Sequence, residues 1–188
     1  MDDYYERAYK TYDSFEFIGD KDPKLFDGYD LLVNKFPNVK IVYIIRNIIE
    51  VAHSFELRAL KTKFDHGVHN VPDNVWPISR NWERAISEWN HSIEQTRRFA
   101  SKLNIHILPY ENLFSDENLF SDENALIRMY AFLGLDFKKS VINFWQQQKQ
   151  YSQKLESNRH LSFSSLQLKT IIEKSDILGY RELLSLAD

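Results

Sequence analysis

Arg46 lies between an apolar segment, residues 40–45, and a segment with helical periodicity, residues 48–63. Residues 40–45 (Lys-Ile-Val-Tyr-Ile-Ile) are rich in β-branched side chains and predict a strand buried on both faces. Arg46 would therefore lie at the carboxyl end of a strand, where parallel sheets bind their ligands. Its guanidinium can donate two parallel hydrogen bonds to a phosphate, and Ser54 could add a hydroxyl. The alternative is that Arg46 only follows a strand and that Ser54 is an ordinary helix residue, with no role in binding.

The residue after this arginine is a good start for a helix. Asn47 is a favourable N-cap, and residues 48–63 are expected to form the helix that follows. A helix N-terminus presents free N–H groups and the positive end of its dipole to a bound anion. Arg46, the helix start and Ser54 thus predict one anion-binding site.

The rest of the chain alternates between extended and helical patterns. Trp82, Ile86, Trp89 and Ile93 recur at helical spacing and are expected to form the core face of a long helix. Gly134 is the expected C-cap of a helix that ends at residue 133. Strands are expected at 14–18, 40–45 and 105–108, and further helices at 24–36, 123–133, 138–150, 164–175 and 180–186. This order predicts a single α/β domain over residues 1–188, with a parallel sheet flanked by helices.

Composition excludes several classes of protein. A net charge of −3 over 188 residues argues against a general nucleic-acid binder. The absence of cysteine excludes disulfides, thiolate catalysis and cysteine-based zinc sites. The longest apolar stretch, residues 41–45, is far too short to span a bilayer. We therefore expect a cytoplasmic protein without a nucleic-acid or membrane partner.

The segment around this arginine is similar to a known motif. Residues 36–47, continued to Ser54, resemble the 3′-phosphate-binding motif of sulfotransferases that use 3′-phosphoadenosine-5′-phosphosulfate (PAPS). The resemblance implies that Arg46 and Ser54 bind the 3′-phosphate of PAPS. The family usually has proline two residues after the arginine, and here Ile48 takes that place. The change affects the helix start and removes no ligand.

Three further segments resemble the same family in the same order. Residues 19–23 (Gly-Asp-Lys-Asp-Pro) resemble its Lys-x-Pro turn, which implies that Lys21 lies near the transferred sulfuryl group. Residues 109–113 with 131–135, and then 178–180, resemble its later segments. The resemblance implies a three-layer, P-loop-transferase-like fold. It also implies transfer of a sulfuryl group from PAPS to a hydroxyl or amine of a small molecule or glycan, without a metal.

The family's usual loop for the 5′-phosphosulfate is not recognisable before Gly19. We therefore expect a domain that is incomplete at its N-terminus, with a missing segment or a second copy as its partner. The alternative is a non-catalytic remnant of the fold that binds a nucleotide or another molecule. Another nucleotide-dependent transferase, such as a kinase, would need a phosphate loop and magnesium ligands that the sequence does not show.

Other polar residues have simpler interpretations. Glu111 is expected to support the fold by hydrogen bonding, while Lys154 and Arg159 could form either a basic clamp or an ordinary solvated face. His66 and His69 lack a third ligand in register, so a metal site there is not expected. Six residues, Glu-Asn-Leu-Phe-Ser-Asp at 111–116, recur unchanged at 117–122. The repeat falls between a predicted strand and a predicted helix, where an insertion costs little.

Overall fold

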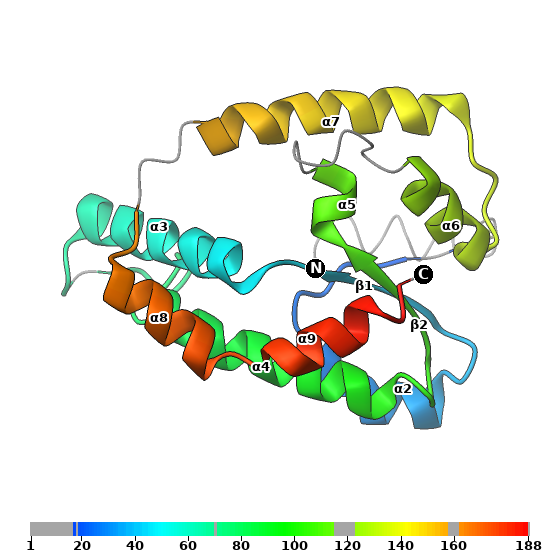
Figure 1. The fold of residues 1–188 in the computed structure, drawn as a ribbon, viewed down its shortest axis with the longest axis horizontal. Coiled ribbons are helices and arrows are strands. Elements are labelled where there is room, and N and C mark those ends of the chain that lie inside the picture. The colour runs from blue at the N-terminus through cyan, green and yellow to red at the C-terminus, as the bar shows by residue number, and fades with distance from the viewer. Residues whose placement is uncertain (1–16, 18, 70, 115–122, 158–161, 188) are drawn as a thin grey trace.

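Two parallel strands form the sheet at the centre of the protein (Figure 1). The computed structural model describes residues 17, 19–69, 71–114, 123–157 and 162–187. Strand β1 (Lys40–Ile45) pairs with β2 (Asn104–Pro109), in a register that places Lys40 opposite Asn104 and Ile45 opposite Pro109. Both strands were predicted from their apolar, β-branched runs, and both are confirmed.

Two long helices connect the strands. Helix α3 (Ile48–His66) begins at Asn47, whose side chain accepts a hydrogen bond from the Ile49 N–H at 2.8 Å, so the predicted N-cap is confirmed. The helix runs three residues beyond its predicted end and stops at Gly67. Gly67 has a φ of 70°, in the left-handed region that glycine adopts without strain. Helix α4 (Trp82–Phe99) follows, capped by Asn81.

The remaining helices largely follow the predicted pattern. The segment predicted as helix 24–36 divides into a 3₁₀ turn, η2 (Leu25–Gly28), and α2 (Tyr29–Lys35). Helix α6 (Glu123–Leu133) ends before Gly134, which has a φ of 78°, as its predicted C-cap role requires. Helix α9 (Ile177–Leu184) starts three residues before its predicted boundary, because the Asp176 side chain accepts the Gly179 N–H at 2.9 Å. The last five are α5 (Tyr110–Phe114), α6 (Glu123–Leu133), α7 (Lys139–Ser157), α8 (Ser165–Lys174) and α9 (Ile177–Leu184).

Apolar side chains cover both faces of the sheet. On one face Ile45 and Ile107 pack with Trp89 and Ile93 of α4, and residues from α3, α8 and α9 complete this cluster. On the other face Leu108 packs with residues of α5, α6 and α7, including Trp145. Figure 1 shows α6 and α7 on the opposite side of the strands from α4 and α8. Successive residues of a strand, such as Ile107 and Leu108, thus pack against different helices.

A small parallel sheet among helices confirms the α/β class at this level. The larger three-layer, P-loop-transferase-like arrangement stays a prediction. The predicted strand at 14–18 lies outside the described residues apart from Phe17, and so does the second copy of the hexapeptide, 117–122. Among the described helices, none is long and apolar enough to cross a membrane.

Gly179 is the most closely packed of the five glycines, and its replacement by alanine should destabilise the protein. An added Cβ would lie 2.8 Å from Ile93 Cγ2 and would overlap the Asp176 carboxylate that caps α9. Overpacking of this kind costs about 1–3 kcal/mol, more than the gain of about 1 kcal/mol in helix propensity. Gly28→Ala, where a Cβ meets nothing within 4 Å, is the matched control. Chemical denaturation that finds equal stability for both variants would contradict this packing.

Candidate functional site

The turn from β1 into α3 is held from two sides. The Trp89 indole N–H of α4 donates to the Arg46 carbonyl oxygen at 2.9 Å. The Asn47 N–H donates to Glu111 Oε1 of α5 at 2.7 Å. Because Ile45 lies opposite Pro109 in the parallel register, the chain leaving β2 necessarily brings Tyr110 and Glu111 beside this turn. The fold-supporting hydrogen bond predicted for Glu111 is therefore present.

The guanidinium of Arg46 lies between an aromatic ring and a carboxylate. Its central carbon is 4.2 Å from the centroid of the Tyr110 ring, within the range of a cation–π interaction. Its Nη2 lies 3.1 Å from Glu50 Oε2, one turn into α3. The Arg46 side chain is only 18% exposed, whereas that of Glu50 is 39% exposed. The arginine is thus oriented before any ligand arrives.

Ser54 lies one turn beyond Glu50 on the same face of α3. Residues four apart on a helix are neighbours, so Glu50 and Ser54 share one face of α3. Ser54 is half-buried, and its hydroxyl makes no hydrogen bond to any residue that the structure describes. Arg46 precedes the N-cap Asn47 and contacts this face through its ion pair with Glu50.

Lys21 lies in an exposed segment that leads into η2. Its backbone N–H donates to the Asp20 side chain at 2.7 Å, and η2 contacts α4 through Asp27 and His91, 2.9 Å apart. In the described part of the chain no hydrogen bond or ion pair joins the Lys21 side chain to Arg46 or Ser54. The role of Lys21 at the transfer site therefore stays a prediction.

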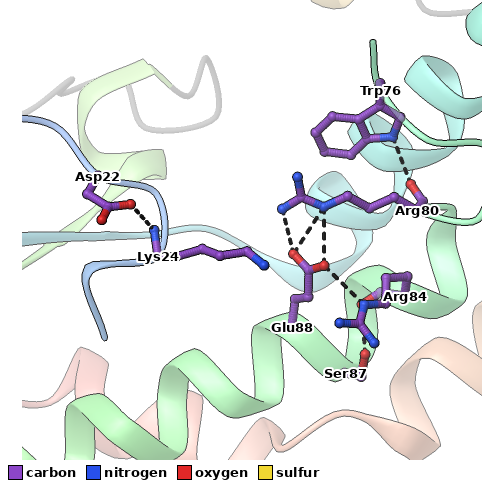
Figure 2. A network of polar contacts seen from close by, with 7 residues as sticks. All are labelled: Asp22, Lys24, Trp76, Arg80, Arg84, Ser87 and Glu88. Atoms are coloured by element: carbon purple, nitrogen blue, oxygen red, sulfur yellow. Dashed lines mark hydrogen bonds and ion pairs between the residues drawn. The ribbon is translucent and has the colours of Figure 1, made fainter. Parts of the chain in front are cut away.

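A network of polar and aromatic contacts holds the segment before α4 against that helix (Figure 2). The sequence analysis did not identify it. Arg80 donates from Nε to Glu88 Oε1 at 3.2 Å and from Nη2 to Glu88 Oε2 at 2.6 Å, and its guanidinium lies 4.2 Å from the Trp76 ring. Arg84 adds a hydrogen bond to Glu88 at 3.1 Å, and Figure 2 shows Lys24 extending toward the same carboxylate. Burial raises the pKa of Glu88, but the two arginines outweigh it and hold this pKa below its usual value. The spacing of Arg80, Arg84 and Glu88 was the available signal.

Tyr180 is a second residue that the sequence analysis did not single out for the site. Its ring lies 5.4 Å from the Trp89 ring, centroid to centroid, so α9 packs behind the turn that carries Arg46. Burial, and next the Glu111 carboxylate, raise the pKa of the Tyr180 hydroxyl to about 12. Glu111 Oε2 is buried and accepts no hydrogen bond from a described residue. The last helix thus contributes to the surroundings of the site.

The described residues contain no group of three or more histidine, cysteine, aspartate or glutamate side chains that could hold a metal ion. His66 ends α3, and His69 follows in an exposed segment. The side chains of Lys154 and Arg159, named above as a possible basic clamp, lie outside the described ones. Arg46 and its neighbours remain the candidate site.

A family model described as "Sulfotransferase family" matches residues 1–139. The chain belongs to the sulfotransferase family. The matched part of this sulfotransferase includes both strands together with Lys21, Arg46 and Ser54, whereas α8 and α9 lie beyond it. No curated protein and no solved structure matches the chain significantly. The resemblance predicted from the sequence is confirmed at the level of the family.

Stability of this sulfotransferase should decrease in alkaline solution through Tyr180 and Tyr29. Both hydroxyls have a pKa raised to about 12, from an ordinary value of 10. Below pH 10 both states are protonated and the stabilisation is complete, whereas between pH 10 and 12 only the unfolded state loses its protons. The free energy of unfolding, measured by denaturation across this range, should therefore fall. Replacement of both tyrosines by phenylalanine should flatten the fall, and an unchanged slope would contradict the assignment.

Proposed function

We propose that this sulfotransferase uses PAPS as its donor and binds the 3′-phosphate with Arg46 and Ser54. The observation that carries the proposal is the position of Arg46, which ends a strand of a parallel sheet and faces the first turns of α3. The acceptor's hydroxyl or amine would attack the sulfur, and the bond from sulfur to the 5′-phosphate oxygen would break. The acceptor's proton would pass to a base, and 3′-phosphoadenosine-5′-phosphate (PAP) would leave.

The orientation of Arg46 supports the binding of an anion. Tyr110 packs against one face of the Arg46 guanidinium. A phosphate accepts hydrogen bonds from N–H groups in the guanidinium plane, so this packing does not block it. The turn behind it is fixed by Trp89 and Glu111, which limits the entropy lost when a ligand binds. The free N–H groups and dipole of α3 add a positive potential at the same place.

Glu50 would compete with the 3′-phosphate. Its carboxylate already holds Arg46 Nη2 at 3.1 Å and occupies the first turn of α3, which is the position that favours an anion. A phosphate that binds Arg46 and Ser54 would bring a second negative charge close to Glu50. The carboxylate should then weaken nucleotide binding, and its movement should accompany binding and release.

Lys21 is proposed to stabilise negative charge on the leaving phosphate or on the sulfuryl oxygens. Its side chain is exposed, so it could approach a bound donor without breaking a hydrogen bond to a described residue. The acceptor is proposed to be a small molecule or a glycan.

A second candidate function is nucleotide binding without transfer. One observation favours it: in the described part of the chain neither strand is followed by a glycine-rich phosphate loop. Only Arg46 and Asn47 separate β1 from α3, and α5 follows β2 directly. Arg46 and Ser54 would hold the 3′ end of the donor, and Lys21 alone is proposed for the reacting end, which catalysis requires to be positioned.

Titration calorimetry with PAP tests the binding proposal. The protein should prefer PAP over adenosine 5′-monophosphate, which lacks the 3′-phosphate. Arg46→Ala should weaken PAP binding at least tenfold, because a hydrogen bond to a charged group contributes about 1.5–3 kcal/mol. Arg98→Ala removes an exposed arginine from α4 and is the matched control. Equal affinity for the two nucleotides would remove the basis of the phosphate site.

Glu50→Gln should change the affinity for PAP in the opposite direction in the same titration. Loss of the competing charge should tighten PAP binding by about three- to tenfold and leave binding of adenosine 5′-monophosphate unchanged. Glu83→Gln, at the start of α4, is the charge-matched control. If Arg46→Ala weakens binding and Glu50→Gln has no effect, Glu50 is not a competitor although the phosphate site stands.

Labelled PAPS offered with panels of phenols, amines and sugars separates the two candidate functions. Transfer predicts a labelled product whose formation depends on the acceptor and falls in Arg46→Ala and Lys21→Ala. Binding alone predicts that PAP is bound with the 3′-phosphate preference and that no acceptor is labelled. Lys24→Ala, three residues away in the same exposed segment, is the control for Lys21.

A further inference from the structure

The C-terminal end of α3 carries an exposed apolar stripe. Phe64 is 90% exposed, Leu60 is 41% exposed, and Val68, just beyond the helix, is 59% exposed. Phe64 and Leu60 are four residues apart and share one helix face. Ala59 and Thr62 form the opposite, buried face. The stripe therefore points away from the core, and core packing does not account for it.

Basic side chains flank this stripe on both sides. At about 100° per residue, Lys61 and Lys63 lie roughly 60° and 100° from Phe64, in opposite directions around the helix. Both lysines are exposed, and neither forms an ion pair with a residue that the structure describes. Arg58 adds a third cation, and Asp65 is the sole acidic residue in 57–69. This local excess of positive charge lies on a chain whose net charge is −3.

The stripe also lies at an extremity of the molecule. In Figure 1 the C-terminal end of α3 is at the left edge, at the opposite end of the helix from the strands. Beside it, a groove of about 380 Å³ is lined by Val68, Val71, Val75 and Ile78, with Asp73 among its polar residues. A flat surface could therefore approach the end of α3 without meeting the sheet or the nucleotide site.

We propose that the end of α3 docks on an anionic lipid surface. Phe64, Leu60 and Val68 insert among the headgroups, and Lys61 and Lys63 contact the lipid phosphates and carboxylates. An apolar helix face flanked by lysines is the usual form of an interfacial segment, and each lysine adds attraction to an anionic leaflet. The proposal concerns attachment to one surface. The sequence argument against a membrane partner addressed only segments that span a bilayer.

The lysines favour a lipid surface over a protein partner. Lysine is depleted in the buried core of protein interfaces, because its ammonium must lose water and its long side chain must lose freedom. At a lipid surface the ammonium stays hydrated beside the phosphates while the side-chain stem covers apolar groups. Lys61 and Lys63, which flank the exposed Phe64, therefore match a lipid surface better than a protein interface.

Cosedimentation of the whole chain with vesicles tests the proposal. The protein should partition into vesicles of phosphatidylcholine mixed with phosphatidylserine, should leave phosphatidylcholine vesicles unbound, and should release at high salt. The double variant Lys61→Gln/Lys63→Gln should lower partitioning at least tenfold, at about fivefold per lysine. Phe64→Ser should lower it roughly tenfold.

Matched controls use equivalent residues elsewhere on the surface. Phe36→Ser removes a phenylalanine that is 58% exposed at the end of α2. Lys138→Gln/Lys139→Gln removes two exposed lysines at the start of α7. Both controls should partition like the unaltered protein. Because Phe64 and the lysines are exposed, their variants should unfold at an unchanged temperature.

Three results would overturn the proposal. Partitioning that is absent or independent of phosphatidylserine would exclude an anionic lipid surface. Equal losses in the controls would show that the end of α3 has no special role. A change in the sedimentation velocity of the free protein on Phe64→Ser would assign the stripe to self-association. None of these results depends on PAP binding, since Arg46 and Ser54 are unaltered.

Discussion

The parallel pairing of β1 with β2 is the constraint on which the candidate site depends. In this register Ile45 lies opposite Pro109, so the residues that leave each strand, Arg46 and Tyr110, emerge side by side. A parallel ladder aligns the carboxyl ends of its strands at one edge, which is why Arg46 contacts the Tyr110 ring and the next N–H, that of Asn47, donates to the Glu111 carboxylate. A shift of one residue would move these side chains to the other face.

The turn after β1 shows how the fold fixes a functional side chain through its backbone. The strand has ended at Arg46, so its carbonyl and the next N–H need partners outside the ladder. Trp89 and Glu111 supply them, and each hydrogen bond contributes about 0.5–3 kcal/mol, more where the partner is charged. Tyr180 packs behind Trp89 from the last helix. The orientation of Arg46 thus relies on α4, α5 and α9, whose residues are far apart in the sequence.

Helix α3 has a different chemical character at each end. At its start, Glu50 and Ser54 share one face, and Arg46 pairs with Glu50 beside the positive end of the helix dipole, which suits an anionic ligand. At its end, exposed apolar residues and two exposed lysines, which form no ion pair with a described residue, suit an anionic surface. Buried residues such as Ala52 and Ala59 join the two ends to the core. One rigid element therefore carries both proposed contacts and keeps them separate.

The sequence alone determined the strands at 40–45 and near 104–109, the cap at Asn47, the helix stop at Gly134 and the sulfotransferase family. These features are local: β-branched runs, capping side chains and motif spacing act over a few residues. The end of α3 at His66 was predicted three residues too early. The helix continues until Gly67, whose backbone adopts the positive φ that ends it. The contact of Arg46 with Tyr110 and the hydrogen bond from Trp89 to its carbonyl were decided only by the tertiary structure. They join residues more than 40 positions apart, and only the pairing of the strands and the packing of α4 bring such residues together.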